Sequence, residues 1–243
     1  MDKPGLHILS TASFKPGLPA LLSGAAVVLD TVPMITISHI VDEPIRHQLR
    51  QWAAQPMMAL FTSRQAVYAV SAAIAPLEPR WQVGCLQGAT LQAVQKHLPY
   101  CNIMATAPFS ASLAQACVPL IRQFPVHFFC GNLHLNHIAH CFAQHNIPLQ
   151  QTTVYHTVLT PVAVKGHYDA ILFFSPSAVK SYFTLNRPKA STVLFATGPG
   201  TAAAITPYDA GHTVVVAHQP GGQALMEAVI QYFGLQPPAL PQP

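Results

Sequence analysis

The sequence predicts an α/β protein in which two parallel-sheet, three-layer domains are joined by a two-stranded β linker. Short apolar runs alternate with segments of helical periodicity along most of the chain, which is typical of parallel sheets covered by helices. Two extended runs, near residues 35–41 and 150–159, are not followed by helices in the same rhythm. Nearly every predicted strand is also followed by Gly, Ser or Thr.

The elements predicted before residue 55 begin in a first sheet, which the chain then leaves. They are a strand, a short helix, an extended run and a longer helix, at residues 6–10, 17–23, 26–37 and 43–54. Pro33 interrupts the extended run, because proline cannot donate to a sheet ladder. Pro44 fits the first turn of the longer helix, where its missing N–H is not needed.

Regular alternation follows. The predicted strand–helix pairs are 57–62 with 64–74, 81–86 with 89–98, 102–106 with 111–124, 126–130 with 133–144, 169–174 with 178–185, 192–196 with 201–205, and 213–217 with 223–233. The two extended runs then divide the chain into a discontinuous domain (1–34 plus 160–243), linker strands (35–42 and 149–159) and an inserted domain (43–148). Residues 236–243 are Pro-rich and are expected to form a flexible tail.

Composition narrows the possible functions. Hydrophobic residues make up 51% and charged residues 8% of the 243 residues, yet no apolar run is long enough to span a membrane. Twelve Lys and Arg are scattered, so a nucleic-acid surface is not expected. Five cysteines without a C-x-x-C pair suggest buried, reduced thiols, and no signal peptide is evident, so we expect a cytoplasmic protein.

The stretch at 126–161 shows the repeating unit most fully. Residues 126–130 are a continuous apolar run, after which Gly131 and Asn132 supply a turn and a helix N-cap. Leu135, Ile138 and Phe142 follow at helical spacing. The extended run that comes next carries Tyr155 and ends before Pro161.

Small and hydroxyl residues at the strand ends indicate an anion-binding edge. In open α/β sheets ligands bind at the carboxyl ends of strands, where helix N-termini offer N–H groups and a favourable dipole. For any single turn, helix capping alone is the preferred explanation. Their recurrence in both predicted domains favours a ligand with many negative charges.

The 126–161 stretch resembles uroporphyrinogen-III synthases, in which a C-G-N turn precedes a V-Y-x-T strand; here these are residues 130–132 and 154–157. Further matches are F-T-S at 61–63, a G-x-x-T-like turn at 88–90, D-A-I-L-F-F-S-P-S at 169–177 and A-T-G-P-G-T-A at 196–202. The chain departs from the family pattern at Thr11-Ala12-Ser13, in place of T-R-P, and at Arg64, which lies one place early.

The resemblance implies a reaction: hydroxymethylbilane loses water and closes to uroporphyrinogen III with ring D inverted. It implies no cofactor and no metal. Tyr155 would be catalytic, assisting the departing hydroxyl. The predicted substrate-binding residues are Thr62, Ser63, Arg64, Gly88, Thr90, Gly131, Asn132, Ser175, Ser177, Gly200 and Thr201. The partner would be a small polycarboxylate tetrapyrrole, with no nucleic acid or membrane, and the protein is expected to be a monomer.

Other interpretations remain open at this point. Tyr155 can be a packed strand aromatic, and the chain can be a cytosolic two-domain module that binds an anionic small molecule without catalysis. His134, His137 and His140 fan too widely over one helix for a three-ligand metal site, so a polar helix face is preferred. Gly198 and Gly200 do not complete a dinucleotide fingerprint.

Overall fold

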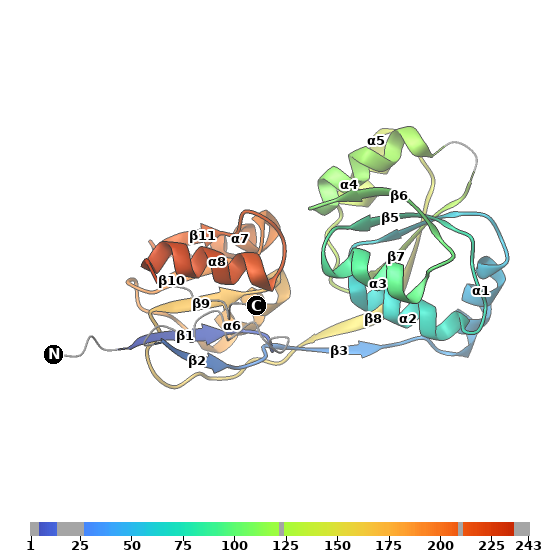
Figure 1. The fold of residues 1–243 in the computed structure, drawn as a ribbon. Coiled ribbons are helices and arrows are strands. Elements are labelled where there is room, and N and C mark those ends of the chain that lie inside the picture. Colours follow the sequence, from blue (N-terminus) through green and yellow to red (C-terminus); the bar gives the residue numbers. More distant parts are fainter. Residues whose placement is uncertain (1–4, 14–26, 122–123, 209–210, 236–243) are drawn as a thin grey trace, which may run out of the picture. The chain divides into compact units, whose positions relative to one another are not determined.

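The computed structural model describes residues 5–13, 27–121, 124–208 and 211–235. It divides the chain into two compact units (Figure 1). Unit 1 is Met1–Thr36 with Val158–Pro243, and unit 2 is Ile37–Thr157. The predicted helix at 17–23 and the predicted tail at 236–243 lie outside the described residues.

Unit 2 contains a six-stranded sheet in the order β3-β8-β7-β4-β5-β6. Its strands are β3 (Ile35–His39), β4 (Met58–Phe61), β5 (Gln82–Leu86), β6 (Asn102–Ala107), β7 (Val126–Gly131) and β8 (Leu149–Leu159). The pairs from β8 to β6 are parallel. The chain winds outward from β4 to β6 and then returns to the other side of β4, so the winding reverses between β4 and β7.

Both faces of this sheet are covered by helices, because alternate residues of its central strands are buried on opposite sides. Ala59 and Phe61 of β4 pack in one cluster with α1 (Glu43–Ala53), α2 (Arg64–Ile74) and α3 (Ala89–His97). Met58 and Leu60 pack in another with α4 (Ser110–Cys117) and α5 (His137–Gln144). The continuous apolar runs in the sequence are therefore strands buried on both faces.

Unit 1 is built on the same principle with another strand order. Its sheet runs β11-β10-β9-β1-β2, all parallel, from β1 (Leu6–Ser10), β2 (Val27–Thr31), β9 (Ala170–Phe173), β10 (Val193–Ala196) and β11 (Val214–Val216). The helix α8 (Gly222–Phe233) packs on one face. The helices α6 (Pro176–Leu185) and α7 (Pro199–Ile205) pack on the other, and the winding reverses between β1 and β9.

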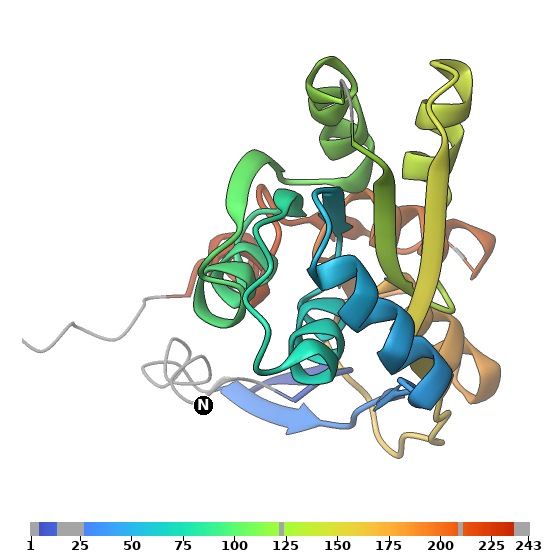
Figure 2. The same cartoon turned by 90° about the vertical axis from the view of Figure 1, so that its right-hand side faces the viewer.

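The long strand β8 belongs to the sheet of unit 2 as well as to the predicted linker. It lies parallel beside β7 (Figure 2), and on its other edge it pairs with β3. The Ile40 N–H donates to the Val154 carbonyl (3.2 Å) and the Thr160 N–H to the Met34 carbonyl (3.0 Å), so β3 and β8 are antiparallel. The two predicted linker strands thus pair with each other, and β8 continues the six-stranded sheet.

Two predicted helices are shorter than their periodicity suggested. The helix expected at 111–124 ends at Cys117 and continues only as a 3₁₀ turn, Val118–Leu120, because Pro119 has no N–H for an α-helical bond. The helix expected at 133–144 begins at His137. Its N-cap is Asn136 and not Asn132, and Leu135 lies outside the helix with its side chain exposed.

The remaining strands and helices lie within a few residues of their predicted positions, and the α/β fold class with parallel sheets is confirmed. Within the described ranges, no helix is both long enough and apolar enough to traverse a lipid bilayer.

Candidate active site

The reversal point of the unit 2 sheet brings two predicted binding turns together. Thr62 and Ser63 follow β4, and Gly131 ends β7, its direct neighbour in the sheet. Open α/β sheets bind ligands outside such a reversal, because the two loops leave toward opposite faces. This reversal point is therefore the candidate ligand site of unit 2.

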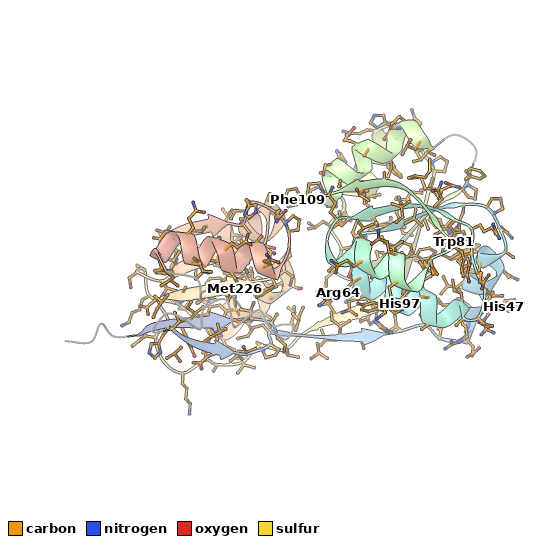
Figure 3. All side chains as sticks on the ribbon, viewed as in Figure 1. His47, Arg64, Trp81, His97, Phe109 and Met226 are labelled. Atoms are coloured by element: carbon orange, nitrogen blue, oxygen red, sulfur yellow. The ribbon has the colours of Figure 1, made fainter. Side chains whose placement is uncertain are left out.

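Ser63 stands on one side of the reversal point. Its side-chain oxygen accepts a hydrogen bond from the Gln65 N–H (3.2 Å) and so caps α2. The first residue of α2 is Arg64, whose side chain is exposed and stands at this edge of unit 2 (Figure 3). A cation at a helix N-terminus opposes the helix dipole, so Arg64 adds attraction for an anion there without helping the helix.

Tyr155 reaches the same place because β8 contains a bulge. Cys130 pairs with Thr153 and Gly131 pairs with Tyr155, so Val154 has no partner on β7. A bulge of this kind re-aims the side chains that follow it. The tyrosine ring lies directly on Gly131: a Cβ added to that glycine would be 2.4 Å from Cζ and 2.8 Å from the phenolic oxygen of Tyr155.

The environment of Tyr155 keeps its phenol protonated. Burial raises the pKa of Tyr155 above its usual value, and a hydrogen bond with the Ser63 side chain offsets part of this effect. The half-buried phenol is therefore a neutral donor at physiological pH. It lies where β4 and β7 both end, which is the place that the fold offers to a ligand.

Asn132 does not point its amide at a helix. Its Oδ1 accepts a hydrogen bond from the Thr157 N–H (2.8 Å), and its Nδ2 donates to the Thr157 carbonyl (3.3 Å). The Asn132 backbone N–H donates to the Tyr155 carbonyl (3.3 Å). Asn132 therefore holds β8 and cannot at the same time cap α5, which corrects the predicted N-cap.

The rest of the unit 2 edge is made mainly of backbone. Gly88 is the N-cap of α3 with φ of 70°, a conformation that glycine adopts without strain, and no side chain caps that helix. Thr90, in the first turn of α3, is buried. Phe109 is the N-cap of α4, again without a capping side chain, and its ring stands at this edge (Figure 3).

In unit 1, Ser175 is the counterpart of Ser63. Its Oγ accepts from the Ala178 N–H (3.2 Å) as the cap of α6, and it lies 3.0 Å from the Ser177 Oγ. Thr201 is buried within α7, and its hydroxyl lies 3.4 Å from that of Thr197. Gly200 stands in the first turn of α7, whose N-cap is Gly198.

Acidic residues are missing from the first turns of α2 to α8, where proteins commonly place them. Within this set of helices, only Ser63 and Ser175 provide a side-chain cap; α3, α4, α5, α7 and α8 have none. Their first N–H groups thus stay available to a ligand. Serine stands at the N-caps of α2 and α6, glycine at those of α3, α7 and α8, and phenylalanine and asparagine at those of α4 and α5.

The structure brings some predicted residues together and sets others apart. Tyr155, Ser63 and Gly131 meet at the reversal point of unit 2, and Asn132 follows Gly131 and binds Thr157 of β8. Thr90 and Thr201 are buried as whole residues, so little of either side chain is open to a ligand. Two polar residues of the unit 1 edge were not predicted: Thr197, whose hydroxyl donates to the Phe174 carbonyl (3.2 Å), and Thr11, which donates to the Leu172 carbonyl (2.7 Å). Their position directly after β10 and β1 was the signal that could have found them.

The histidines of the α5 region do not gather into a metal site. Within the described part of the chain, no group of three or more His, Cys, Asp or Glu side chains is placed to hold a metal ion. The ring of His134 instead lies 2.8 Å from the Gly131 carbonyl through Nδ1, and His137 and His140 are exposed.

Comparison with known proteins agrees with this architecture. The family model described as uroporphyrinogen-III synthase HemD matches residues 20–227. The structure of uroporphyrinogen-III synthetase from Helicobacter pylori aligns with a TM-score of 0.63 at 15% identity, over 93% of this chain and 99% of that one. A mutant uroporphyrinogen III synthase from Thermus thermophilus aligns with a TM-score of 0.64 at 14% identity, over 96% and 100%. No curated protein sequence matches the chain.

At these identities the two solved structures establish the fold alone. The family match is independent of them and extends from residue 20, before β2, into α8. It includes every turn discussed above that follows a strand from β4 onward. The chain therefore belongs to the uroporphyrinogen-III synthase family.

Proposed function

We propose that this chain converts hydroxymethylbilane into uroporphyrinogen III in tetrapyrrole biosynthesis, and that it does so as a hydro-lyase that closes the ring. The substrate is a linear tetrapyrrole with eight carboxylates. It loses the hydroxyl of its terminal hydroxymethyl group as water, and the macrocycle closes with ring D inverted. Membership of the uroporphyrinogen-III synthase family supports the assignment.

One observation carries the chemical part of the proposal: the protonated phenol of Tyr155, held over Gly131 beside Ser63. Breaking the carbon–oxygen bond of the hydroxymethyl group leaves negative charge on the departing oxygen unless a proton reaches it. A phenol donating a hydrogen bond to that oxygen assists as a general acid. The raised pKa of Tyr155 keeps this proton in place through the neutral range.

Carboxylate binding is assigned to the helix N-termini. The open N–H groups of α3, α4 and α8 suit carboxylates, as does the exposed guanidinium of Arg64. Of the predicted substrate-binding residues, six would act mainly through such backbone contacts: Thr62, Ser63, Gly88, Ser175, Ser177 and Gly200. Catalysis then consists largely of holding the substrate in the conformer that leads to inversion.

The chemistry asks for no cofactor, and we propose that the chain acts alone, as a monomer in the cytoplasm. Its five cysteines are all free, and Cys85, Cys117, Cys130 and Cys141 are buried. Burial raises the pKa of the Cys117 thiol to about 12, so it stays unreactive. Free thiols of this kind suit a reducing compartment.

The direct test is product identity. The purified chain is incubated with hydroxymethylbilane generated in situ by an upstream deaminase, and the oxidised isomers are separated by chromatography. We expect type III product to exceed type I, with the same ratio after EDTA treatment. Type I product alone, at the rate of the buffer control, would overturn the proposed function. Type III formation that EDTA abolishes and Zn²⁺ restores would overturn the metal-free chemistry only.

A further inference from the structure

The side chain of Asn132 takes the place of a strand residue beside β8. The backbone ladder between β7 and β8 ends at Gly131, opposite Tyr155. One residue later, the amide of Asn132 binds both the N–H and the carbonyl of Thr157, 25 residues further along the chain. An amide side chain can do this because it presents a donor and an acceptor side by side, as a peptide group does.

Tyr155 lies between two fixed points of β8. On one side, Val154 is the bulged residue, and its carbonyl is bound by the Ile40 N–H of the chain next to β3. On the other side, Thr157 is bound by Asn132, while the Tyr155 carbonyl itself accepts from the Asn132 N–H. The backbone of Tyr155 is therefore held before, at and after the residue.

Loss of the Asn132 amide would leave the N–H and carbonyl of Thr157 without their partner on the β7 side, whereas the backbone pairs up to Tyr155 would remain. Thr157 is only 9% exposed, but the Asn132 side chain bonded to it is exposed, so its removal would open the N–H and carbonyl of Thr157 to water. The strand would be drawn away from β7 toward water, and the ring of Tyr155 would move off Gly131. Glycine at 131 allows the close approach in the first place, because any Cβ would occupy the position of the ring.

We infer that Asn132 is a positioning residue: its side chain holds β8 so that the phenol of Tyr155 stays between Gly131 and Ser63. The functional part of this inference rests on the role proposed above for Tyr155. It differs from the predicted role of Asn132 as a substrate ligand, because both polar atoms of its side chain are already engaged with Thr157.

Three variants test the inference. Asn132→Ala removes both side-chain bonds, whereas Asn132→Asp keeps the acceptor for the Thr157 N–H and loses the donor. Asn136→Ala is the matched control: it makes the same change four residues on, at an exposed N-cap whose side chain caps nothing. Hydrogen exchange at the Thr157 amide is read alongside kcat and KM.

We expect Asn132→Ala to expose the Thr157 amide to exchange and to lower kcat by about 10- to 100-fold, the cost of a misplaced catalytic group, with KM nearly unchanged. Asn132→Asp should keep the amide protected and lose less turnover. Asn136→Ala should match the parent in both readouts. Since Asn132 acts through Tyr155, Asn132→Ala should lower kcat by less than about twofold further when Tyr155→Phe is already present.

Each failure has a different meaning. A turnover of Asn132→Ala equal to that of Asn136→Ala, while Tyr155→Phe is impaired, would overturn the positioning role alone. If Asn132→Ala lowers kcat by the same factor with and without Tyr155→Phe, the two residues act independently. That result would also overturn the positioning role and would favour direct contact between Asn132 and the substrate. Parent-like turnover of Tyr155→Phe would overturn the proposed role of Tyr155 and this inference with it. If Asn132→Ala does not fold, the Asn132→Asp variant decides: the positioning role fails if its Thr157 amide exchanges freely.

Discussion

The two sheets of this chain have different strand orders, and helices begin after the carboxyl ends of strands in both. The sheets differ in the residues that lie at the point where the winding reverses. In unit 2 the reversal lies between β4 and β7, where Tyr155 places a phenol over Gly131 beside Ser63. In unit 1 it lies between β1 and β9. There the hydroxyls of Ser10 and Thr11 are buried and donate to the backbone carbonyls of Ala12 and Leu172.

Unit 1 has tyrosines of its own, but they lie elsewhere. Tyr168 precedes β9, at the amino edge of the sheet, and its hydroxyl donates to Asp30 (2.9 Å). Tyr182 is buried within α6. Burial raises the pKa of each to about 12. A raised tyrosine pKa therefore does not identify a site by itself; position at the sheet reversal is what distinguishes Tyr155. On the proposed function, proton donation belongs to unit 2, whereas both units bind anions.

A large effect on both turnover and stability is expected from Gly131→Ala, which places a methyl group where the ring of Tyr155 now lies. The ring must move, so kcat should fall by about 100-fold, as for other misplaced catalytic groups. The free energy of unfolding should fall by about 1–3 kcal/mol, the usual cost of overpacking. Activity assays and thermal unfolding measure the two effects.

The control for this prediction is the double variant with Tyr155→Ala. Removing the ring makes room for the new methyl group, so the unfolding free energy should be less sensitive to Gly131→Ala in that background. An equal loss of stability in both backgrounds would show that the methyl group clashes with something other than Tyr155.

A smaller effect should separate the two capping serines. Ser63→Ala and Ser175→Ala each remove one helix cap, and each should cost about 1 kcal/mol of stability. Ser63 is also the hydrogen-bond partner of Tyr155, so Ser63→Ala should lower kcat by roughly 2- to 10-fold, the worth of one neutral hydrogen bond. Ser175→Ala should act on KM instead. If both variants change kcat and KM alike, the assignment of chemistry to unit 2 is contradicted.

The smallest expected effect is on the stability of the protein at acid pH, and it involves a buried histidine of unit 2. His127 at the start of β7 is buried, its ring centroid lies 4.4 Å from that of Trp52, and its Nδ1 has no hydrogen-bond partner among the described residues. Burial lowers the pKa of His127. On acidification, the unfolded chain therefore binds a proton at a higher pH than the folded chain does. The contribution of neutral His127 to stability is complete above the ordinary histidine pKa of 6.5, and it is lost as pH falls toward the lowered pKa of the folded protein.

His127→Phe should remove part of that acid sensitivity, because a phenylalanine can pack against Trp52 without titrating. Urea unfolding at about pH 7.5 and about pH 5.5, on either side of the histidine pKa, measures it. The variant should lose less stability between the two than the parent does. An equal loss would place the acid sensitivity on other groups.

Local patterns predicted most of the fold. The strand at 6–10 and the helix at 64–74 begin and end as expected, because apolar runs and helical spacing depend on neighbouring residues. The helix at 133–144 was misjudged for the opposite reason. Asn132 looked like a cap to its own segment, but its side chain is engaged by Thr157, and a contact over 25 residues leaves no local pattern.

The candidate site was predictable in kind but not in geometry. Tyr155, Ser63 and Gly131 were named from motifs, and the residue types themselves suggested an anion-binding edge. The bulge at Val154 sets which side chain of β8 lies on Gly131, and it arises from pairing with β7. The buried positions of the Thr90 and Thr201 side chains likewise depend on how α3 and α7 pack on their sheets. Such facts follow from tertiary structure and have no signal in a single sequence.

The most direct measurement compares Tyr155→Phe with Tyr168→Phe in the uroporphyrinogen III assay. Each variant loses one hydroxyl from a tyrosine of raised pKa, one at the reversal point of unit 2 and the other at the amino edge of unit 1. We expect type III turnover to fall by about 10²- to 10⁴-fold in Tyr155→Phe, the range for loss of a general acid, with near-parental melting temperature. Tyr168→Phe should turn over like the parent. Turnover of Tyr155→Phe within about twofold of the parent, far short of that range, would contradict the account and make Tyr155 a packing residue.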